Sequence, residues 1–232
     1  MELINLFNRE AWDIKIAKVL KAFYARGFYK ALFYHSPWKE TAWLGKKVWK
    51  MPLDLWVYQE MICEFRPDFI IECGTFEGGS AFYFASIMDL IHHGKVITID
   101  INTCSMEHPR VVKIVEPDGG SVSPQVVERV GEMVKGAKCM VILDSSHRTK
   151  HVEKELEIYT RFVPVGGYVI VEDTCLAGNP VVPSWRREFG DGGPMEAVER
   201  FLKKEGCGFV VDREKEKYLI SWFPRGYLRR VA

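Results

Sequence analysis

The chain has 232 residues, of which 47% are hydrophobic and 27% charged, and its 32 basic side chains almost balance 31 acidic ones for a net charge of +1. This composition excludes an intrinsically disordered chain, which combines low hydrophobicity with a large net charge. It also argues against a globally basic nucleic-acid-binding protein, so we expect no nucleic-acid partner. The length is that of one domain with a sizeable core and room for an appendage.

The cysteine pattern and the N-terminus indicate a cytoplasmic protein. The six cysteines are scattered, with no C-x-x-C pair and no zinc-ligand spacing, as is typical of a reduced protein. No apolar run approaches the roughly 20 residues that a membrane span needs. Charged residues at Glu2, Arg9, Glu10 and Asp13 interrupt the N-terminal stretch, which disfavours a secretory signal.

Residues 1–65 form a first segment that is rich in aromatic and basic side chains. They hold 14 of the 30 aromatics, and positions 15–50 carry nine Lys or Arg against one acid. Apolar residues at helical spacing predict an amphipathic helix near the start of this stretch: Ile16, Val19, Leu20 and Phe23. We expect Gly27 to interrupt that helix, and a further helix over residues 52–65 to lead into the main domain.

Three roles are open for this first segment. It caps the sheet or forms a subunit interface in the simplest interpretation. Alternatively, residues 15–50 dock on a membrane surface or an anionic glycan, to which basic amphipathic helices with aromatic side chains are suited. Nucleic-acid binding is the third and weakest interpretation.

From residue 66 onward short apolar strands alternate with helices, which predicts a second domain over residues 66–232. The expected strands are 68–73, 95–100, 111–115, 139–144, 167–172, 209–212 and 218–222. Strands that alternate with helices build a parallel sheet covered on both faces, and the last two strands build an antiparallel hairpin. The predicted fold is therefore an α/β, Rossmann-like sheet, mostly parallel, with a C-terminal antiparallel hairpin and an N-terminal helical extension.

Acidic residues stand at the ends of the well-defined strands. They are Glu72, Asp100, Asp144 and the pair Glu172-Asp173. In an open parallel sheet a ligand binds beyond the carboxyl ends of the strands. We therefore expect these five acids to line one cleft.

The turn after the first of these strands reads E-C-G-T-F-E-G-G-S, from Glu72 to Ser80. It lacks the G-x-G-x-x-G spacing with which a dinucleotide fold places a pyrophosphate on a helix N-terminus. An acid before the first glycine suits S-adenosylmethionine, which carries an ammonium group and no phosphate. Gly74 would let the backbone approach this cofactor closely, and Asp100 would accept hydrogen bonds from its ribose hydroxyls. The alternative is an ordinary tight turn with helix-capping acids.

Asp144, Glu172 and Asp173 come from two strands that we expect to be neighbours, so that three carboxylates would converge. Unpaired carboxylates raise one another's pKa, whereas Mg²⁺ accepts oxygen ligands in such an arrangement. The alternative is that each acid caps its own loop. His147, three residues after Asp144 in D-S-S-H, is either a surface histidine or, beside a metal, a general base for a hydroxyl.

Six stretches of the chain carry a specific combination of motifs. They are P-L-D-L-W-V-Y-Q-E, I-I-E-C-G-T-F-E-G-G-S, V-I-L-D-S-S-H, Y-V-I-V-E-D-T, G-G-P-M-E-A-V-E-R-F-L and R-E-K-E-K-Y-L-I-S-W-F-P-R-G-Y-L-R-R. Together, over roughly residues 46–230, they resemble the cephalosporin hydroxylase family. The resemblance implies a class I S-adenosylmethionine-dependent methyltransferase fold, with magnesium-dependent sugar O-methyltransferases and rhamnosyl O-methyltransferases as relatives. It also favours a homo-oligomer.

By this resemblance Asp144, Glu172 and Asp173 are ligands of Mg²⁺, and His147 is the base. The cofactor residues that it implies are Glu72, Gly74, Thr75 and Ser80 with Asp100, to which Gly79 of the glycine turn is added. The stretch E-P-D-G-G-S over residues 116–121 departs from the family pattern. It leaves Asp118 and Ser121 as the candidates for contact with adenine.

The expected reaction transfers the sulfonium methyl of S-adenosylmethionine to a hydroxyl of a sugar, glycolipid or polyol-like small molecule. Two other functions stay open: a metal-dependent hydroxylase, as the family name suggests, and an accessory subunit that keeps the cofactor fold without turnover. Iron sites of hydroxylases commonly use two histidines and one carboxylate, whereas this cleft offers three carboxylates and at most one histidine. Residues 176–192, rich in Gly and Pro, are either a substrate lid or a plain surface loop.

Overall fold

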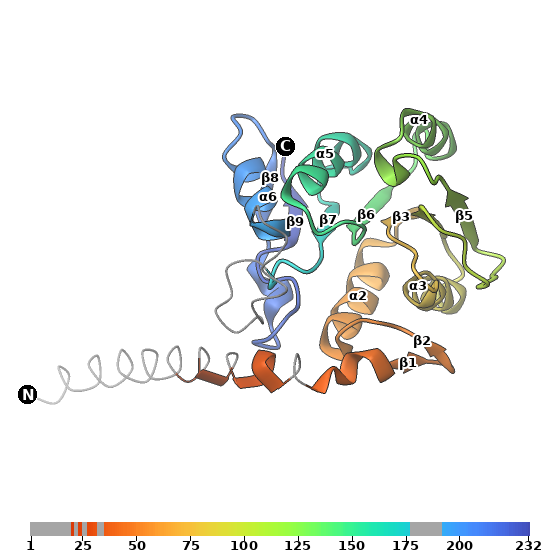
Figure 1. Cartoon of the computed structure of the whole chain (residues 1–232). Coiled ribbons are helices and arrows are strands. Elements are labelled where there is room, and N and C mark those ends of the chain that lie inside the picture. The colour runs from red at the N-terminus through yellow and green to blue at the C-terminus, as the bar shows by residue number, and fades with distance from the viewer. Residues whose placement is uncertain (1–19, 21–22, 25–26, 32–34, 177–191) are drawn as a thin grey trace, which may run out of the picture.

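The apolar segments after residue 66 pair into one sheet. The computed structural model describes residues 20, 23–24, 27–31, 35–176 and 192–232, which leaves most of the predicted lid outside the described residues. The strands of the sheet are β3 (Phe69–Cys73), β4 (Lys95–Asp100), β5 (Val111–Val115), β6 (Cys139–Leu143), β7 (Tyr168–Val171), β8 (Phe209–Val211) and β9 (Tyr227–Arg230). Their order is β5-β4-β3-β6-β7-β9-β8 (Figure 1).

The direction of the strands confirms the predicted fold class. Neighbouring strands from β5 to β7 are parallel, while β9 is antiparallel to both β7 and β8. The expected neighbours β6 and β7 do pair, so the residues that follow them lie at one edge of the sheet.

The C-terminal hairpin differs from the predicted one in its second strand. We expected a strand at residues 218–222, but the strand that pairs with β8 is β9, and the 3₁₀ helix η5 (Arg213–Glu216) follows β8. The backbone of residues 218–222 is bonded elsewhere. The Trp222 amide donates to Asp54 Oδ2 at 2.8 Å, and the Ser221 carbonyl accepts from the Tyr29 hydroxyl. These contacts use backbone groups that a strand ladder would need.

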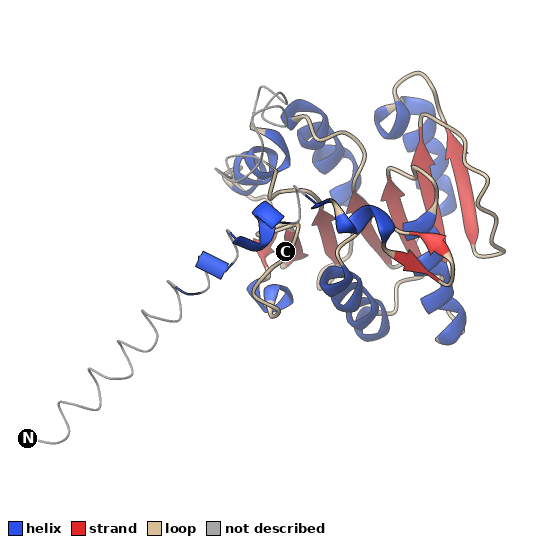
Figure 2. Cartoon of the chain, turned by 60° about the horizontal axis from the view of Figure 1, so that its bottom comes forward, coloured by secondary structure: helices blue, strands red, loops and turns tan. Residues whose placement is uncertain are grey.

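Helices cover both faces of the sheet (Figure 1, Figure 2). One face carries α2 (Pro52–Phe65) and α3 (Gly79–Leu90), and the other carries α4 (Pro124–Met133), α5 (Thr149–Tyr159) and α6 (Gly193–Leu202). Side chains of a strand alternate between the faces, so Ile70 packs toward α2 and α3 whereas Ile71 packs toward α4 and α5. This alternation also decides on which side the acids at the strand ends lie.

The N-terminal segment packs on the face of α2 and α3 from residue 37 onward. It contains the 3₁₀ helix η1 (Pro37–Glu40) and a hairpin of β1 (Ala42–Trp43) and β2 (Lys46–Lys47). Trp38, Val48 and Met51 are buried in the same hydrophobic cluster as α2 and α3. Gly79 at the start of α3 permits this packing, because a Cβ there would lie 1.8 Å from the Lys47 carbonyl oxygen.

The earliest described residues are helical. Leu20 and Phe23 belong to the predicted amphipathic helix, most of which lies outside the described residues, and both are exposed. Residues 27–31 are helical too, so Gly27 itself is part of a helix. A single glycine costs a helix only about 1 kcal/mol, which neighbouring residues can offset. The described residues do not show whether this helix is continuous with the one at Phe23, and the expected interruption stays a prediction. In the described part of the chain, no helix is both long and apolar enough to cross a membrane.

Asp54 of α2 ties the C-terminal segment to the core, and we expect its removal to destabilise the fold. Its carboxylate is buried and accepts hydrogen bonds from the Trp222 amide at 2.8 Å and the Tyr227 hydroxyl at 3.0 Å. Asp54→Ala leaves both donors unsatisfied, so the free energy of unfolding in urea should fall by about 3 kcal/mol. Tyr227→Phe removes one of the bonds and should cost about 1 kcal/mol. Unchanged stability of Asp54→Ala would contradict this role.

Candidate active site

A cavity of about 610 Å³ lies beyond the carboxyl ends of the parallel strands. The chain runs from β3 to β4 and β5 on one side and to β6 and β7 on the other, so the strand order reverses between β3 and β6. Open α/β sheets bind their ligands at such a switch point. The turns after β3, β4 and β6 line the cavity, together with η2 (Gly120–Val122) and with Trp38, Trp49 and Lys50 of the N-terminal segment.

Gly74 allows the turns after β3 and β6 to touch. Its φ is +102°, and a Cβ at this position would lie 2.1 Å from the carbonyl oxygen of Asp144. The Asp144 amide in turn donates to the Cys73 carbonyl at 2.8 Å. Because a side chain has no room here, bare backbone borders the cavity, and a cofactor can approach it closely.

Asp100, at the end of β4, holds the same turn in place. Its Oδ2 accepts the amides of Thr75 at 2.8 Å and Phe76 at 2.9 Å, and its Oδ1 accepts the amide of Asn102 at 2.9 Å. The Thr75 hydroxyl lies 2.7 Å from the Thr98 hydroxyl. Asp100 and Thr75 both line the cavity, and their contacts with a cofactor stay predictions.

Glu72 lies behind the cavity wall rather than in it, which corrects the expectation that five acids line one cleft. The alternation of β3 turns its side chain toward the face of α2 and α3, where Oε2 accepts a hydrogen bond from Thr98 Oγ1 at 2.6 Å. Burial raises the pKa of Glu72 to about 7, although the positive charge of Lys50 acts in the opposite direction.

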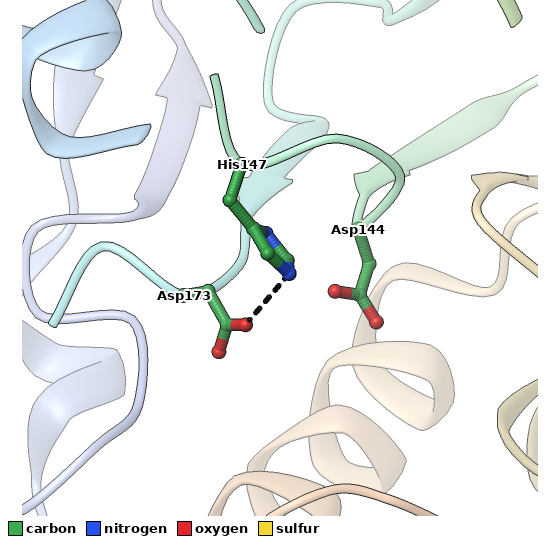
Figure 3. Close-up of side chains that lie close together, drawn as sticks. All are labelled: Asp144, His147 and Asp173. Carbon is green, nitrogen blue, oxygen red and sulfur yellow. Dashed lines mark ion pairs between the residues drawn. The ribbon is translucent and has the colours of Figure 1, made fainter. Parts of the chain in front are cut away.

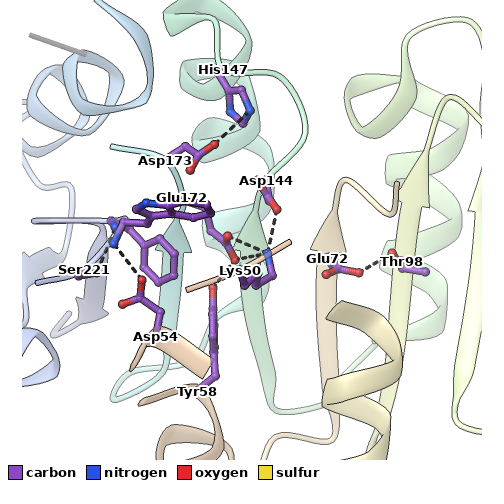
Figure 4. A network of polar contacts seen from close by, with 12 residues as sticks. Lys50, Asp54, Tyr58, Glu72, Thr98, Asp144, His147, Glu172, Asp173 and Ser221 are labelled. Carbon is purple, nitrogen blue, oxygen red and sulfur yellow. Dashed lines mark hydrogen bonds and ion pairs between the residues drawn. The ribbon is translucent and has the colours of Figure 1, made fainter. Parts of the chain in front are cut away.

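Glu172 is the second acid behind the wall, and it is paired with a buried lysine (Figure 4). Lys50 Nζ lies 2.7 Å from both carboxylate oxygens of Glu172 and 2.8 Å from Asp144 Oδ2. The Tyr58 hydroxyl of α2 donates to Glu172 at 2.6 Å. Burial and, after it, the charge of Asp144 raise the pKa of Glu172 well above its usual value. That Glu172 is a metal ligand stays a prediction.

Asp144, His147 and Asp173 converge at the cavity (Figure 3). One ligand atom from each lies within 4.8 Å of the others, and His147 Nε2 lies 3.2 Å from Asp173 Oδ2. The three side chains are partly exposed, at 25%, 27% and 20%. Asp173 has a φ of +57°, in the left-handed region that aspartate adopts more readily than most non-glycine residues. Two carboxylates and one imidazole suit a divalent cation.

The remaining predicted cofactor residues differ in their position. Ser80 and Ser121 line the cavity, and the Ser121 hydroxyl donates to Glu155 at 2.5 Å. Gly79 also lines it, with its backbone against Lys47. Asp118 is exposed and lies outside the lining. Of the two candidates for contact with adenine, Ser121 is therefore the better placed.

Four aromatic side chains border the cavity, and we call them the aromatic wall. They are Trp38, Trp49, Phe76 and Trp222. The ring centroid of Trp38 lies 5.3 Å from that of Trp49 and 5.1 Å from that of Trp222, and Trp49 and Phe76 are 4.5 Å apart. Trp49 and Phe76 are 38% and 54% exposed, so their rings are accessible to a ligand.

Lys50, Tyr58 and the aromatic wall are features that local sequence patterns do not identify as parts of a site. Lys50 is one of the nine basic residues at positions 15–50, and no motif of the sequence assigned it to the cleft. Its burial follows from the packing of residues 37–51 on α2 and α3, for which the sequence carries no periodic signal.

The fold and the site together define a Rossmann-like methyltransferase. The chain belongs to the family described as Rhamnosyl O-methyltransferase/CmcI, whose model matches residues 35–231. The Rhamnosyl O-methyltransferases of Mycobacterium tuberculosis (strain ATCC 25618 / H37Rv) and Mycobacterium leprae (strain TN) are 34% and 32% identical to it. These matches span 89% of this chain and 84% and 90% of the two relatives.

Two solved structures show the same fold. A structure of CmcI with Mg and SAM has a TM-score of 0.59 at 22% identity, and the match covers 84% of this chain and 78% of that one. A putative caffeoyl-CoA O-methyltransferase from Staphylococcus aureus has a TM-score of 0.52 at 20% identity, over 78% of this chain and 84% of that one. The predicted family and fold are thus confirmed, and the chain is an S-adenosylmethionine-dependent O-methyltransferase.

The raised pKa of Glu72 predicts a pH-dependent stability. The carboxyl titrates near 4.5 when unfolded and near 7 when folded, so the unfolded state loses the proton first and stability falls as the pH rises through this window. Between pH 5 and pH 8 the free energy of unfolding of Glu72→Gln should therefore gain about 2.5 kcal/mol relative to the unmodified protein, measured in urea. Glu132→Gln, at an exposed position of α4, is the control and should show no such change.

Proposed function

We propose that this enzyme transfers the methyl group of S-adenosylmethionine to a hydroxyl of a sugar-bearing acceptor, with Mg²⁺ held at Asp144 and Asp173. The observation that carries the proposal is the group of Asp144, His147 and Asp173 at the switch point, next to the glycine turn. The sugar acceptor is supported by the names of the relatives, which are rhamnosyl O-methyltransferases.

The donor side of the cavity is formed by the turns after β3 and β4. Gly74 leaves backbone accessible at the cavity, which Asp100 and Ser121 also line. In the proposal Asp100 binds the ribose hydroxyls and Ser121 contacts the adenine. Glu72 supports the turn from behind, because Thr98 donates to it and also lies 2.7 Å from the Thr75 hydroxyl. The donor therefore meets a loop whose shape is set by hydrogen bonds beneath it.

The cation side fits a hard divalent ion. Asp144 and Asp173 offer carboxylate oxygens of the kind that Mg²⁺ prefers, on two neighbouring strands. When bound, Mg²⁺ would polarise an acceptor hydroxyl and lower its pKa. A hydroxylase with an iron site is not favoured, because this group contains one histidine rather than two.

His147 is the base that would take the proton of the attacking hydroxyl. Its Nε2 lies 3.2 Å from Asp173 Oδ2, so the carboxylate orients the imidazole and stabilises its charged form after proton transfer. Holding donor and acceptor in contact would supply much of the remaining rate.

The aromatic wall is the surface that would receive the acceptor. Its exposed members, Trp49 and Phe76, offer flat apolar rings beside the polar group of Asp144 and His147. A sugar ring has an apolar C–H face and polar edges, which matches a pocket of aromatic walls with a few polar groups. Whether residues 15–50 also contact a membrane or a glycan, and whether the enzyme is a cytoplasmic homo-oligomer, stay predictions.

Asp144→Asn tests the metal-assisted reaction. The variant keeps the shape of the side chain but loses the charge, so methyl transfer from labelled S-adenosylmethionine to methyl α-rhamnoside should fall by roughly 100-fold or more. The dissociation constant for S-adenosylmethionine, measured by calorimetry, should stay within about threefold, because Asp144 acts on the cation side. Glu132→Gln serves as the control for loss of a carboxylate. Retained activity after loss of Asp144 and Asp173 together would rule out the metal site.

Trp49→Ala tests the acceptor surface. Loss of the exposed ring should raise the KM for methyl α-rhamnoside by about tenfold while the affinity for S-adenosylmethionine stays the same. The matched control is Trp56→Ala, which removes a tryptophan of α2 that is 58% exposed and lies outside the cavity lining. An equal KM in both variants would contradict the assignment of the aromatic wall to the acceptor site.

A further inference from the structure

Lys50 is a buried ammonium in the wall beside the candidate metal group. Its side chain is 2% exposed, and Nζ lies 2.8 Å from Asp144 Oδ2 and 2.7 Å from each carboxylate oxygen of Glu172. An ammonium has three N–H donors, so these three bonds use its whole capacity. Lysine is almost never fully buried unless it is paired, and here the partners are two of the acids predicted to bind metal.

The backbone holds Lys50 in this position. Its amide donates to the Val48 carbonyl at 2.8 Å, and the Val48 amide donates to the Thr41 carbonyl at 2.8 Å. Met51, the next residue, is buried in the cluster of α2 and α3. The lysine therefore enters the site from a segment that is fixed on both sides of it, not from a loose surface loop.

Asp144 belongs to two groups at once. Its Oδ2 accepts from Lys50, and the same side chain converges with His147 and Asp173. Figure 4 shows Lys50 between Asp144 and Glu172, below the pair of His147 and Asp173. A divalent cation at Asp144 would share a carboxylate with a buried ammonium, and like charges repel strongly where little water screens them.

We infer that Lys50 is a built-in counter-cation, which competes with the divalent cation for the carboxylates of Asp144 and Glu172. The inference rests on the proposed function, because it takes a divalent cation at Asp144 as given. Without Lys50, two neighbouring carboxylates would lack an opposite charge, and a divalent cation would be their best partner. The lysine thus weakens metal binding while it keeps the site assembled when no metal is bound.

The test measures the affinity for Mn²⁺, a paramagnetic substitute for Mg²⁺. Binding is followed by electron paramagnetic resonance on the purified full chain without S-adenosylmethionine. Lys50→Met keeps an unbranched side chain, one atom shorter, and removes its charge, so it should bind Mn²⁺ roughly tenfold more tightly or better. Lys50→Arg keeps the charge and should stay within about threefold of the unmodified protein. So should Lys46→Met, the matched loss of an exposed lysine in β2. A merely structural role predicts weaker binding in Lys50→Met, because a damaged site loses affinity.

A second measurement applies if Lys50→Met does not fold. In unmodified protein labelled with ¹⁵N on the lysine side chains, the Lys50 ammonium signal can be assigned by its absence from Lys50→Arg. This signal should move when Mg²⁺ is added to saturation, and an unchanged signal would overturn the inference.

The outcomes separate the two proposals. Equal Mn²⁺ affinity of Lys50→Met and the unmodified protein would overturn the role of Lys50 and leave the metal site standing. Absence of Mn²⁺ binding in every variant, the unmodified protein included, would overturn the metal site itself.

Discussion

The close contact between Gly74 and Asp144 determines where the site lies. The turns after β3 and β6 meet at the switch point because Gly74 has no side chain, and a Cβ there would lie 2.1 Å from the Asp144 carbonyl oxygen. The same contact fixes the backbone of Asp144, whose amide is bonded to Cys73. The turns after β3 and β6 are therefore coupled through one backbone contact, and in the proposed function this contact brings the donor and the cation together.

The acids at the strand ends are of two kinds, one buried and one bordering the cavity. Glu72 and Glu172 are buried on the face of α2 and α3, and burial raises their pKa values. Thr98 donates to one carboxylate oxygen of Glu72, whereas the Tyr58 hydroxyl and the Lys50 ammonium donate to Glu172. Asp144 and Asp173 line the cavity and stay partly exposed. The first kind supports the wall and the second kind faces the ligand. A sequence that places an acid after every strand does not reveal this division. By alternation Asp144 lies on the same face as Ile142 and Glu72, so its exposure depends on which segments of the chain cover it.

Most of the sheet could be predicted because each strand carries its own local signal, and the glycine turn and the acids follow the strands directly. Lys50 and Trp49 carry no such signal, since their places depend on how a segment without periodicity packs on α2 and α3. The predicted strand at residues 218–222 has the composition of a strand, but long-range bonds to Asp54 and Tyr29 take its backbone groups. The strand propensity of residues 218–222 was therefore overridden by tertiary contacts with distant parts of the chain.

The near-zero net charge is the sum of a basic N-terminal segment and a more acidic sheet domain, and the fold brings some of these opposite charges into contact. Positions 15–50 hold nine basic residues against one acid, whereas the acids of the site belong to the sheet domain. Lys50 connects the two parts, because it belongs to the basic segment but is buried against Asp144 and Glu172 of the sheet domain. Trp38 and Trp49 of the same segment border the cavity. A segment that supplies both a buried charge and two of the four rings of the aromatic wall contributes to the cavity as well as to the packing on the sheet, since Lys50 balances the charge of Asp144 and Glu172.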